Sequence, residues 1–247
     1  MANDAIYARQ QSLGLQGSEL TVCVIGCGGV GCWVALALAM GGIRELLLFD
    51  GDSLSEHNLN RLPFPLASVG QLKSEALANW LQSLRPDLEI QARGAWDRRL
   101  HARCYKSTAN EYINWVVCAT DSLKSRQAVY SWVREDVGCH YLELGADGER
   151  WTMGAEPPQF STALENEPGY AIVPVHVGPC MMAGAAAAYY VLHNCEVPGD
   201  HLGEWLTNGE PERLNIQAYM PATVDDQRLL ADVARVTELG NLAGERD

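Results

Sequence analysis

The pattern of apolar and polar positions begins with two apolar runs on either side of a glycine-rich turn. Val22–Ile25 is a short, mostly β-branched run and predicts a strand. After the turn, Gly29–Met40 is almost entirely apolar and predicts a helix, while Leu46–Phe49 predicts a second strand. Continuous apolar runs bounded by turn residues are typical of parallel strands that are covered on both faces. The pattern therefore predicts a β-α-β unit.

The rest of the chain continues to alternate between strand-like and helix-like stretches. Further strands are predicted over Leu88–Ala92, Trp115–Ala119, His140–Leu144, Arg150–Met153 and Leu214–Tyr219, the fourth returning antiparallel after a turn at Gly145–Gly148. Helices are predicted over Asp4–Gln11, Gln71–Leu84, Ser125–Arg134, Met181–His193 and Asp225–Leu239. This order predicts an α/β fold with a Rossmann-like, doubly wound, mainly parallel sheet and antiparallel strands in its C-terminal half. We expect one domain over residues 1–220 and an acidic helix and tail over 221–247.

Charge and composition narrow the class of protein. The 247 residues carry a net charge of −13, which argues against a nucleic-acid surface. The first residues lack the basic start and apolar core of a signal peptide, and the longest apolar runs are too short to cross a bilayer. None of the eight cysteines forms a C-x-x-C pair, so we expect no structural zinc. These features predict a cytoplasmic protein with mostly buried, reduced thiols.

The glycine-rich turn is the first candidate binding element. Gly26, Gly28 and Gly31 have the G-x-G-x-x-G spacing, between a predicted strand and a predicted helix. Such a turn lets a diphosphate approach backbone N–H groups at the helix N-terminus. Asp50 ends the next predicted strand, where a ribose-binding acid is expected. Many dinucleotide and mononucleotide binders share these features, so the turn alone leaves the ligand open.

Polar side chains downstream make a dinucleotide redox cofactor a poor match. They follow the predicted strand ends: Asp52, Asn58, Asn60, Arg61, Lys73 and Asp121. A hydride-transfer enzyme uses the glycines and one acid, and has no evident use for the others. A polyphosphate site does, because Arg61 and Lys73 can hold triphosphate oxygens and Asp121 can hold a bridging Mg²⁺.

This ordered set of motifs resembles the E1-like adenylyltransferase family, which includes the ThiF, MoeB and HesA proteins, the TcdA dehydratases and the ubiquitin-activating enzymes. The resemblance covers about residues 6–219. It rests on Tyr7-Ala8-Arg9-Gln10, Gly26-x-Gly28-Gly29-x-Gly31, Asp50-x-Asp52, Asn58-Leu59-Asn60-Arg61, Lys73, Thr120-Asp121-Ser122 with Arg126, and Val177-Gly178-Pro179.

The resemblance implies a homodimer or pseudo-dimer that uses Mg²⁺ and ATP to adenylate a carboxylate, commonly the C-terminal Gly-Gly of a small ubiquitin-like or sulfur-carrier protein. It implies that Asp50 binds the ribose and that Asn60, Arg61 and Lys73 bind phosphates. Asp121 would bind Mg²⁺, and Arg9 would reach the γ-phosphate from the other subunit. The glycines, including Gly29, and the polar residues Asp52 and Asn58 complete the implied nucleotide site.

Two departures from the family pattern concern cysteines. Sulfur-carrier members have paired C-x-x-C zinc ligands, which this chain lacks. Members that form a thioester or persulfide have a cysteine in a crossover loop, but residues 154–177 contain none. Cys180 follows this segment and is the candidate nucleophile, against the simpler interpretation of a buried residue at a helix start.

Three functional hypotheses remain. The first is adenylation of a ubiquitin-like or sulfur-carrier protein, with or without a thioester and an E2-like partner. The second is TcdA-like activation of a small carboxylate, such as one on a tRNA base, although the acidic charge weighs against tRNA docking. The third is an inactive scaffold subunit, against which Arg61, Lys73 and Asp121 argue. The basic stretch 93–106 and the acidic tail suggest no function.

Overall fold

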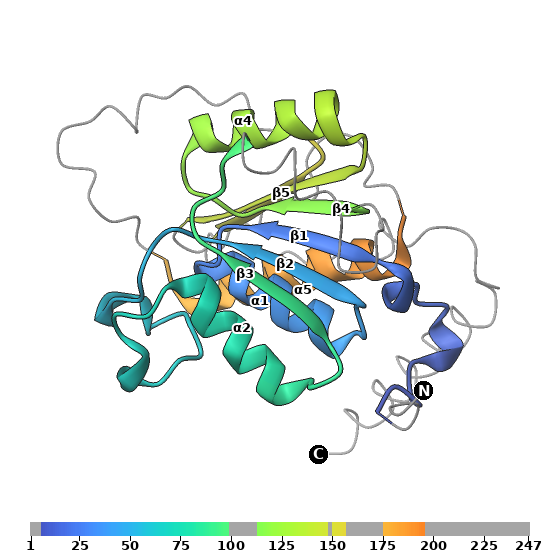
Figure 1. Ribbon diagram of the computed structural model, residues 1–247, viewed down its shortest axis with the longest axis horizontal. Helices are drawn as coiled ribbons and strands as arrows, with labels where there is room; N and C mark the ends of the chain where they lie inside the picture. Colours follow the sequence, from blue (N-terminus) through green and yellow to red (C-terminus); the bar gives the residue numbers. More distant parts are fainter. Residues whose placement is uncertain (1–5, 99–112, 148–149, 157–174, 196–247) are drawn as a thin grey trace, which may run out of the picture. The chain divides into compact units, whose positions relative to one another are not determined.

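The computed structural model describes residues 6–98, 113–147, 150–156 and 175–195, and six strands form one sheet there (Figure 1). The strand order is β3-β2-β1-β4-β5-β6, in which the first five run parallel and β6 runs antiparallel to β5. The strands are β1 (Thr21–Ile25), β2 (Glu45–Phe49), β3 (Glu89–Arg93), β4 (Trp115–Cys118), β5 (His140–Asp147) and β6 (Arg150–Gly154). The predicted α/β fold with a mainly parallel sheet is confirmed.

The central strands are buried on both faces. Every residue of β1, β2 and β4 is buried, which explains their continuous apolar runs. The chain passes from β1 outward to β2 and β3, then returns to the other side of β1 for β4 and β5. The strand order therefore reverses between β1 and β4, and in doubly wound sheets ligands bind at such a point, beyond the carboxyl ends of the strands.

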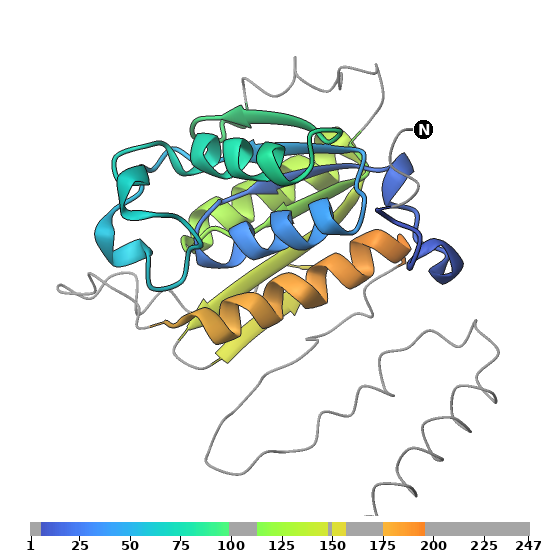
Figure 2. The same ribbon diagram turned by 90° about the horizontal axis from the view of Figure 1, so that it is seen from below.

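Helices cover the two faces unequally. The helices α1 (Gly29–Met40), α2 (Lys73–Leu84) and α5 (Val177–His193) pack on one face, and α4 (Leu123–Trp132) packs on the other (Figures 1 and 2). Figure 2 shows α1 and α5 side by side beneath the sheet. Gly184 of α5 lies so close to α1 that a Cβ there would be 2.6 Å from Cβ of Trp33. The small residues of α5 thus serve core packing in this protein.

The start of α5 differs from the prediction. The helix begins at Val177, four residues before the predicted Met181. The sequence Gly178-Pro179 suggests a break, but the first turn of a helix needs no intrahelical N–H donors, so proline fits there. The side chain of His176 accepts a hydrogen bond from the N–H of Gly178 (3.1 Å) and caps this end.

Two other predicted elements are wrong in detail. Ile6–Gln10 forms turns rather than a helix, and a short 3₁₀-helix, η1 (Gln11–Leu13), follows and ends at Gly14 in the left-handed conformation. Residues 145–147 continue β5 rather than forming a turn, because they pair with β6. Gly145 and Gly148 suggest a turn locally, but they do not reveal that this segment pairs with a neighbouring strand.

Several predictions lie outside the described residues. These are the strand at Leu214–Tyr219, the helix at Asp225–Leu239, the domain boundary at residue 220 and most of the basic stretch 93–106. They stay predictions. In the described part of the chain, no helix has both the length and the apolarity that crossing a membrane requires.

Candidate active site

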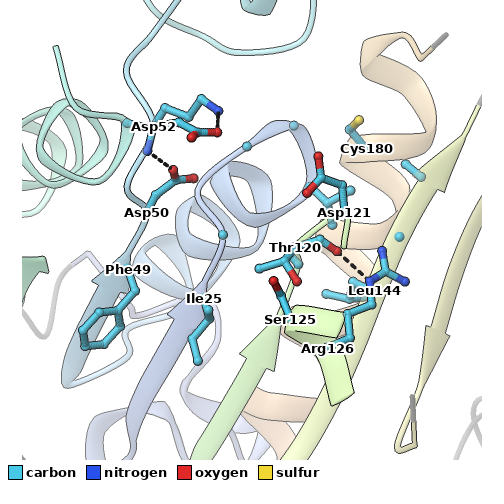
Figure 3. A pocket seen from close by; sticks show the side chains of 18 of the residues that line it. Ile25, Phe49, Asp50, Asp52, Thr120, Asp121, Ser125, Arg126, Leu144 and Cys180 are labelled. Carbon is cyan, nitrogen blue, oxygen red and sulfur yellow. Dashed lines mark hydrogen bonds and ion pairs between the residues drawn. The ribbon is translucent and has the colours of Figure 1, made fainter. Parts of the chain in front are cut away.

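A cavity of about 550 Å³ opens at the carboxyl ends of the central strands, where the strand order reverses. Figure 3 shows Asp50 and Asp52 on one side of the glycine turn and Asp121, Arg126 and Cys180 on the other. The predicted residues that line the cavity are Gly26, Gly28, Gly29, Asp50, Asp52, Asn58, Arg61, Lys73, Asp121 and Cys180. Gly31 and Asn60 do not line it.

The glycines of the turn serve different purposes. Gly26 has a φ of +94°, and a Cβ there would be 2.7 Å from the carbonyl oxygen of Ala119. A Cβ on Gly31 would overlap the carbonyl oxygen of Gly26. By contrast, a Cβ on Gly28 would meet no atom within 4 Å. Gly28 is the N-cap of α1 and has no side chain to cap the helix, so the first N–H groups of α1 are open to an anion in the cavity.

The residues after β2 form a charged side of the cavity. The Asp50 carboxylate accepts hydrogen bonds from the N–H of Cys27 (2.7 Å) and of Asp52 (2.8 Å). Burial raises the pKa of Asp50, and these hydrogen bonds and Lys73 oppose that shift. The ammonium of Lys73 lies 2.8 Å from the exposed carboxylate of Asp52. Asp50 therefore joins the glycine turn to the loop after β2, and Asp52 holds Lys73 at the cavity wall.

The loop over residues 55–61 positions the Arg61 guanidinium. Nη1 of Arg61 donates to the carbonyl oxygen of His57 (3.1 Å) and to Oδ1 of Asn60 (2.9 Å). A Cβ on Gly29 would be 3.0 Å from Cδ of Arg61, so this side chain lies directly over the first turn of α1. The Arg61 guanidinium and the N-terminus of α1 thus face the same part of the cavity, and this arrangement suits a polyanion.

The two asparagines of this loop make structural contacts. Asn58 is buried, and its Oδ1 accepts the N–H of Ser55 in a capping box that begins the 3₁₀-helix η3 (Glu56–Asn58). Nδ2 of Asn60 donates to the carbonyl oxygen of Val175 (3.1 Å). The predicted phosphate contact of Asn60 and the predicted place of Asn58 in the nucleotide site stay predictions, since these amide groups already hold the loop.

The opposite side of the cavity follows β4. Asp121 is exposed there, between Thr120 and Ser122, the N-cap of α4. Nε of Arg126 donates to the carbonyl oxygen of Thr120 (2.6 Å), and Nη1 lies 2.9 Å from the buried carboxylate of Glu143. Burial raises the pKa of Glu143 to about 7, while Arg126 and then Tyr141 oppose that shift.

The chemistry of these residues fits Mg²⁺ together with a polyphosphate. In the described part of the chain, no three His, Cys, Asp or Glu side chains come together as a metal cage. Mg²⁺ needs no such cage, because it is commonly held by one or two carboxylates and the phosphate oxygens of its substrate. Asp121 can supply that carboxylate.

Cys180 is buried in the first turn of α5, and its sulfur packs against Gly29, where a Cβ would be only 3.0 Å from it. Burial raises the pKa of this thiol to about 11, although Arg61 opposes the shift. Cys180 is therefore protonated at neutral pH, and the structure gives it the surroundings of a packing residue.

We expect Cys180 to react slowly with iodoacetamide at pH 7.5, about 100-fold more slowly than glutathione, because the thiolate fraction falls tenfold for each unit of raised pKa. Timed alkylation followed by peptide mass spectrometry measures this rate, and the half-buried Cys195 serves as the internal comparison. Labelling of Cys180 as fast as glutathione would contradict this expectation and restore it as an activated nucleophile.

Arg9 lies far from the cavity of its own chain. Its neighbours contact the turn after α1: Nε2 of Gln10 donates to the carbonyl oxygen of Gly41 (2.9 Å), and a Cβ on Gly42 would meet the Tyr7 ring. This turn leads into β2 and so lies at the amino ends of the strands. Arg9 therefore does not line the cavity of its own chain, and its role at the site of a second copy stays a prediction.

Local motifs did not identify several residues at the site. His57, Trp96 and Ser125 line the cavity, and Glu143 supports it through Arg126. Glu143 left a signal in the sequence, since a charged residue between two leucines of a buried strand needs a partner. Trp96 follows β3, and nothing in the sequence around it indicates a place at the site.

Sequence comparison decides the family. Residues 7–142, more than half of the chain, match the ThiF family. The chain belongs to the ThiF family. The resemblance drawn from the ordered motifs is therefore confirmed for the segment that contains the glycine turn, the loop after β2 and the β4 rim.

Individual relatives of this ThiF-family chain divide between two kinds of protein. It is 31% identical to the tRNA threonylcarbamoyladenosine dehydratase of Haemophilus influenzae over 58% of this chain and 52% of that protein. It is 42% identical to ubiquitin-like modifier-activating enzyme 5 of Xenopus laevis over 60% of this chain and 42% of that protein. The chain thus spans about half the length of these relatives.

Solved structures agree on the fold. The Escherichia coli tRNA N6-threonylcarbamoyladenosine dehydratase in complex with AMP matches with a TM-score of 0.62 at 20% identity, over 77% of this chain and 92% of that one. At this identity the match supports the Rossmann-like ThiF fold and leaves the substrate open.

Proposed function

We propose that this protein uses ATP and Mg²⁺ to adenylate a carboxylate and releases pyrophosphate. The acceptor would be the C-terminus of a small ubiquitin-like or sulfur-carrier protein. The observation that carries the proposal is that two cations, Arg61 and Lys73, and a further acid, Asp121, line the same cavity as the glycine turn. Such a distribution suits a triphosphate and its metal, whereas a dinucleotide redox cofactor needs neither the two cations nor the second acid.

The chemistry explains why these charges are needed. A carboxylate oxygen of the acceptor attacks the α-phosphorus, a new P–O bond forms, and the bond to the β-phosphate oxygen breaks. Two anions approach each other in this step, so the barrier depends on cations that neutralise the phosphates. Arg61, over the first turn of α1, and Lys73 would supply this charge, and Asp50 would orient the ribose. Mg²⁺ held by Asp121 would neutralise further phosphate charge.

The position of Arg9 supports a homodimer. This side chain lies at the amino ends of the strands of its own chain, so a γ-phosphate contact requires a second copy. An arginine supplied in this way would act as a finger on the leaving pyrophosphate. After adenylation, transfer to a thiol and an E2-like partner is a further possible step, and the protonated, buried Cys180 gives it little support.

A second acceptor, a carboxylate on a tRNA base, is favoured by the similarity to the Haemophilus dehydratase. The net charge of −13 disfavours it, because tRNA binding depends on lysine and arginine contacts to phosphate. The protein acceptor is favoured by this charge and by the similarity to ubiquitin-like modifier-activating enzyme 5.

We expect acceptor-dependent exchange of labelled pyrophosphate into ATP, and a loss of at least about 100-fold in Asp121→Ala, since the metal would lose its protein carboxylate. Exchange is measured with a ubiquitin-like protein ending in Gly-Gly and, separately, with unfractionated tRNA. Stimulation by the protein alone supports the first acceptor, and stimulation by tRNA alone supports the second.

The matched control is Asp87→Ala, which removes an exposed carboxylate between α2 and β3, at the amino ends of the strands. Its exchange rate should equal that of the unsubstituted protein. Undiminished exchange in Asp121→Ala would remove Asp121 from the site, and no exchange with either acceptor would contradict the proposed function.

A further inference from the structure

Arg126 and Glu143 form a charged pair that the proposed chemistry does not itself use. Arg126 is one-seventh exposed by side chain and Glu143 is almost fully buried, and Nη1 and Oε1 are 2.9 Å apart. Removing two such charges from water is costly, and a buried pair is often no more stabilising than apolar residues of similar volume. Stability alone therefore gives no reason for an ion pair at this place in the core.

The position of the pair suggests a different purpose. Nε of Arg126 donates to the carbonyl oxygen of Thr120 over 2.6 Å, one residue before Asp121. One residue after Asp121, the Ser122 side chain caps α4 by accepting the N–H of Ser125. Asp121 is thus an exposed residue between two neighbours, Thr120 and Ser122, that hydrogen bonds hold in place. Its carboxylate is held at the rim by its neighbours' contacts rather than by its own.

Glu143 holds the guanidinium in the orientation that reaches Thr120. It extends from β5, and its second oxygen lies 3.4 Å from the hydroxyl of Tyr141. On the far side, Nη2 of Arg126 lies close to Gly145, where a Cβ would be 3.3 Å away. Arg126 lines the cavity, so without its counter-charge this cation would be attracted toward phosphates there. The carboxylate of Glu143 neutralises the charge of Arg126 and so prevents that movement.

We propose that Glu143, acting through Arg126 and the Thr120 carbonyl, is a positioning residue that sets the Asp121 carboxylate for Mg²⁺ bound with ATP. This inference rests on the proposed function. It makes the pair specific to the metal, because Glu143 bonds to Arg126 and Tyr141. Arg61 and Lys73, which would bind the phosphates, are held instead by His57, Asn60 and Asp52.

The test compares ATP binding to the full chain in Mg²⁺ and in EDTA, by calorimetry at pH 8.5, for the unsubstituted protein and for Glu143→Gln. At this pH Glu143 is ionised, because the pH lies above its raised pKa of about 7. The substitution keeps the shape and removes the charge. We expect the Kd for ATP in Mg²⁺ to rise about tenfold, as when a supporting partner of a metal ligand is lost. The Kd in EDTA should change less than twofold, because the phosphate contacts remain.

The matched control is Glu45→Gln, which makes the same chemical change at a fully buried glutamate of β2, hydrogen-bonded to Thr21 and Gln91 at the amino ends of the strands. It should lower the melting temperature without altering the ratio of the two Kd values. If Glu143 served stability alone, Glu143→Gln would behave like Glu45→Gln: the melting temperature would fall, and the ratio of the two Kd values would not change.

A second variant protects against failure to fold. Arg126→Met combined with Glu143→Leu replaces the pair by apolar residues, a change that buried ion pairs commonly tolerate, and it should show the same loss confined to Mg²⁺. Equal losses in Mg²⁺ and EDTA, or no loss in either, would overturn the inference alone. If the unsubstituted protein shows no Mg²⁺-dependent ATP binding, the proposed function fails as well.

Discussion

Arg61→Ala should lower the rate of acceptor-dependent pyrophosphate exchange by about 1,000-fold, the range seen when a cation that stabilises phosphoryl-transfer charge is removed. The Arg61 guanidinium lies over Gly29 at the N-terminus of α1, where cation and helix dipole act on the same phosphates. Arg61→Lys should recover only part of the rate. A lysine ammonium cannot reproduce the planar donor set that contacts the His57 carbonyl and Asn60.

Two measurements separate this chemical effect from damage to the loop. The backbone carbonyl of Arg61 accepts a hydrogen bond from Nε1 of Trp33 (3.0 Å), which any residue at position 61 retains. The melting temperature of Arg61→Ala should therefore change little. Arg134→Ala removes an exposed arginine beside Tyr130 and should leave exchange unchanged. If Arg61→Ala exchanges pyrophosphate within tenfold of the unsubstituted rate, the guanidinium does not bind the reacting phosphates.

The sequence predicts the central sheet well because each central strand carries its own signal. The runs at β1, β2 and β4 are continuously apolar, and burial on both faces requires that locally. For two other predicted elements, one end was placed wrongly. The extension of β5 through Asp147 requires pairing with β6, and the early start of α5 is disguised by a proline that only a first turn accommodates.

For the candidate site too, the sequence predicts the positions that follow from the local signals of the strands. Residues at or just beyond strand ends, such as Asp50 after β2 and Asp121 after β4, must lie at the carboxyl rim once the strands are parallel. The structure adds what spacing cannot reveal. The amides of Asn58 and Asn60 are already bonded within their own loop or to Val175, and Arg126 is bonded to Glu143, seventeen positions along the chain. Only the assembled fold brings these pairs together.

Gly31→Ala should destabilise the protein by about 3 kcal/mol or more, at the upper end of what overpacking costs. A Cβ at this position would overlap the carbonyl oxygen of Gly26 and lie 2.9 Å from its carbonyl carbon. Neither atom can give way easily. The backbone of Gly26 has a φ of +94° and is itself packed against the Ala119 carbonyl. Urea unfolding followed by circular dichroism measures the loss, and a change below 1 kcal/mol would contradict the close contact.

Gly28→Ala is the matched substitution in the same turn, and the structure separates the two. A Cβ on Gly28 meets no protein atom within 4 Å, and the backbone there has a negative φ of −76°, so unfolding in urea should change by less than about 1 kcal/mol. The methyl group would occupy space at the N-terminus of α1 that a phosphate needs, so ATP binding should weaken at least about tenfold. Gly31→Ala should therefore lose stability first, and Gly28→Ala should lose ATP while remaining folded. Normal ATP binding by Gly28→Ala would mean that the phosphates do not approach this turn.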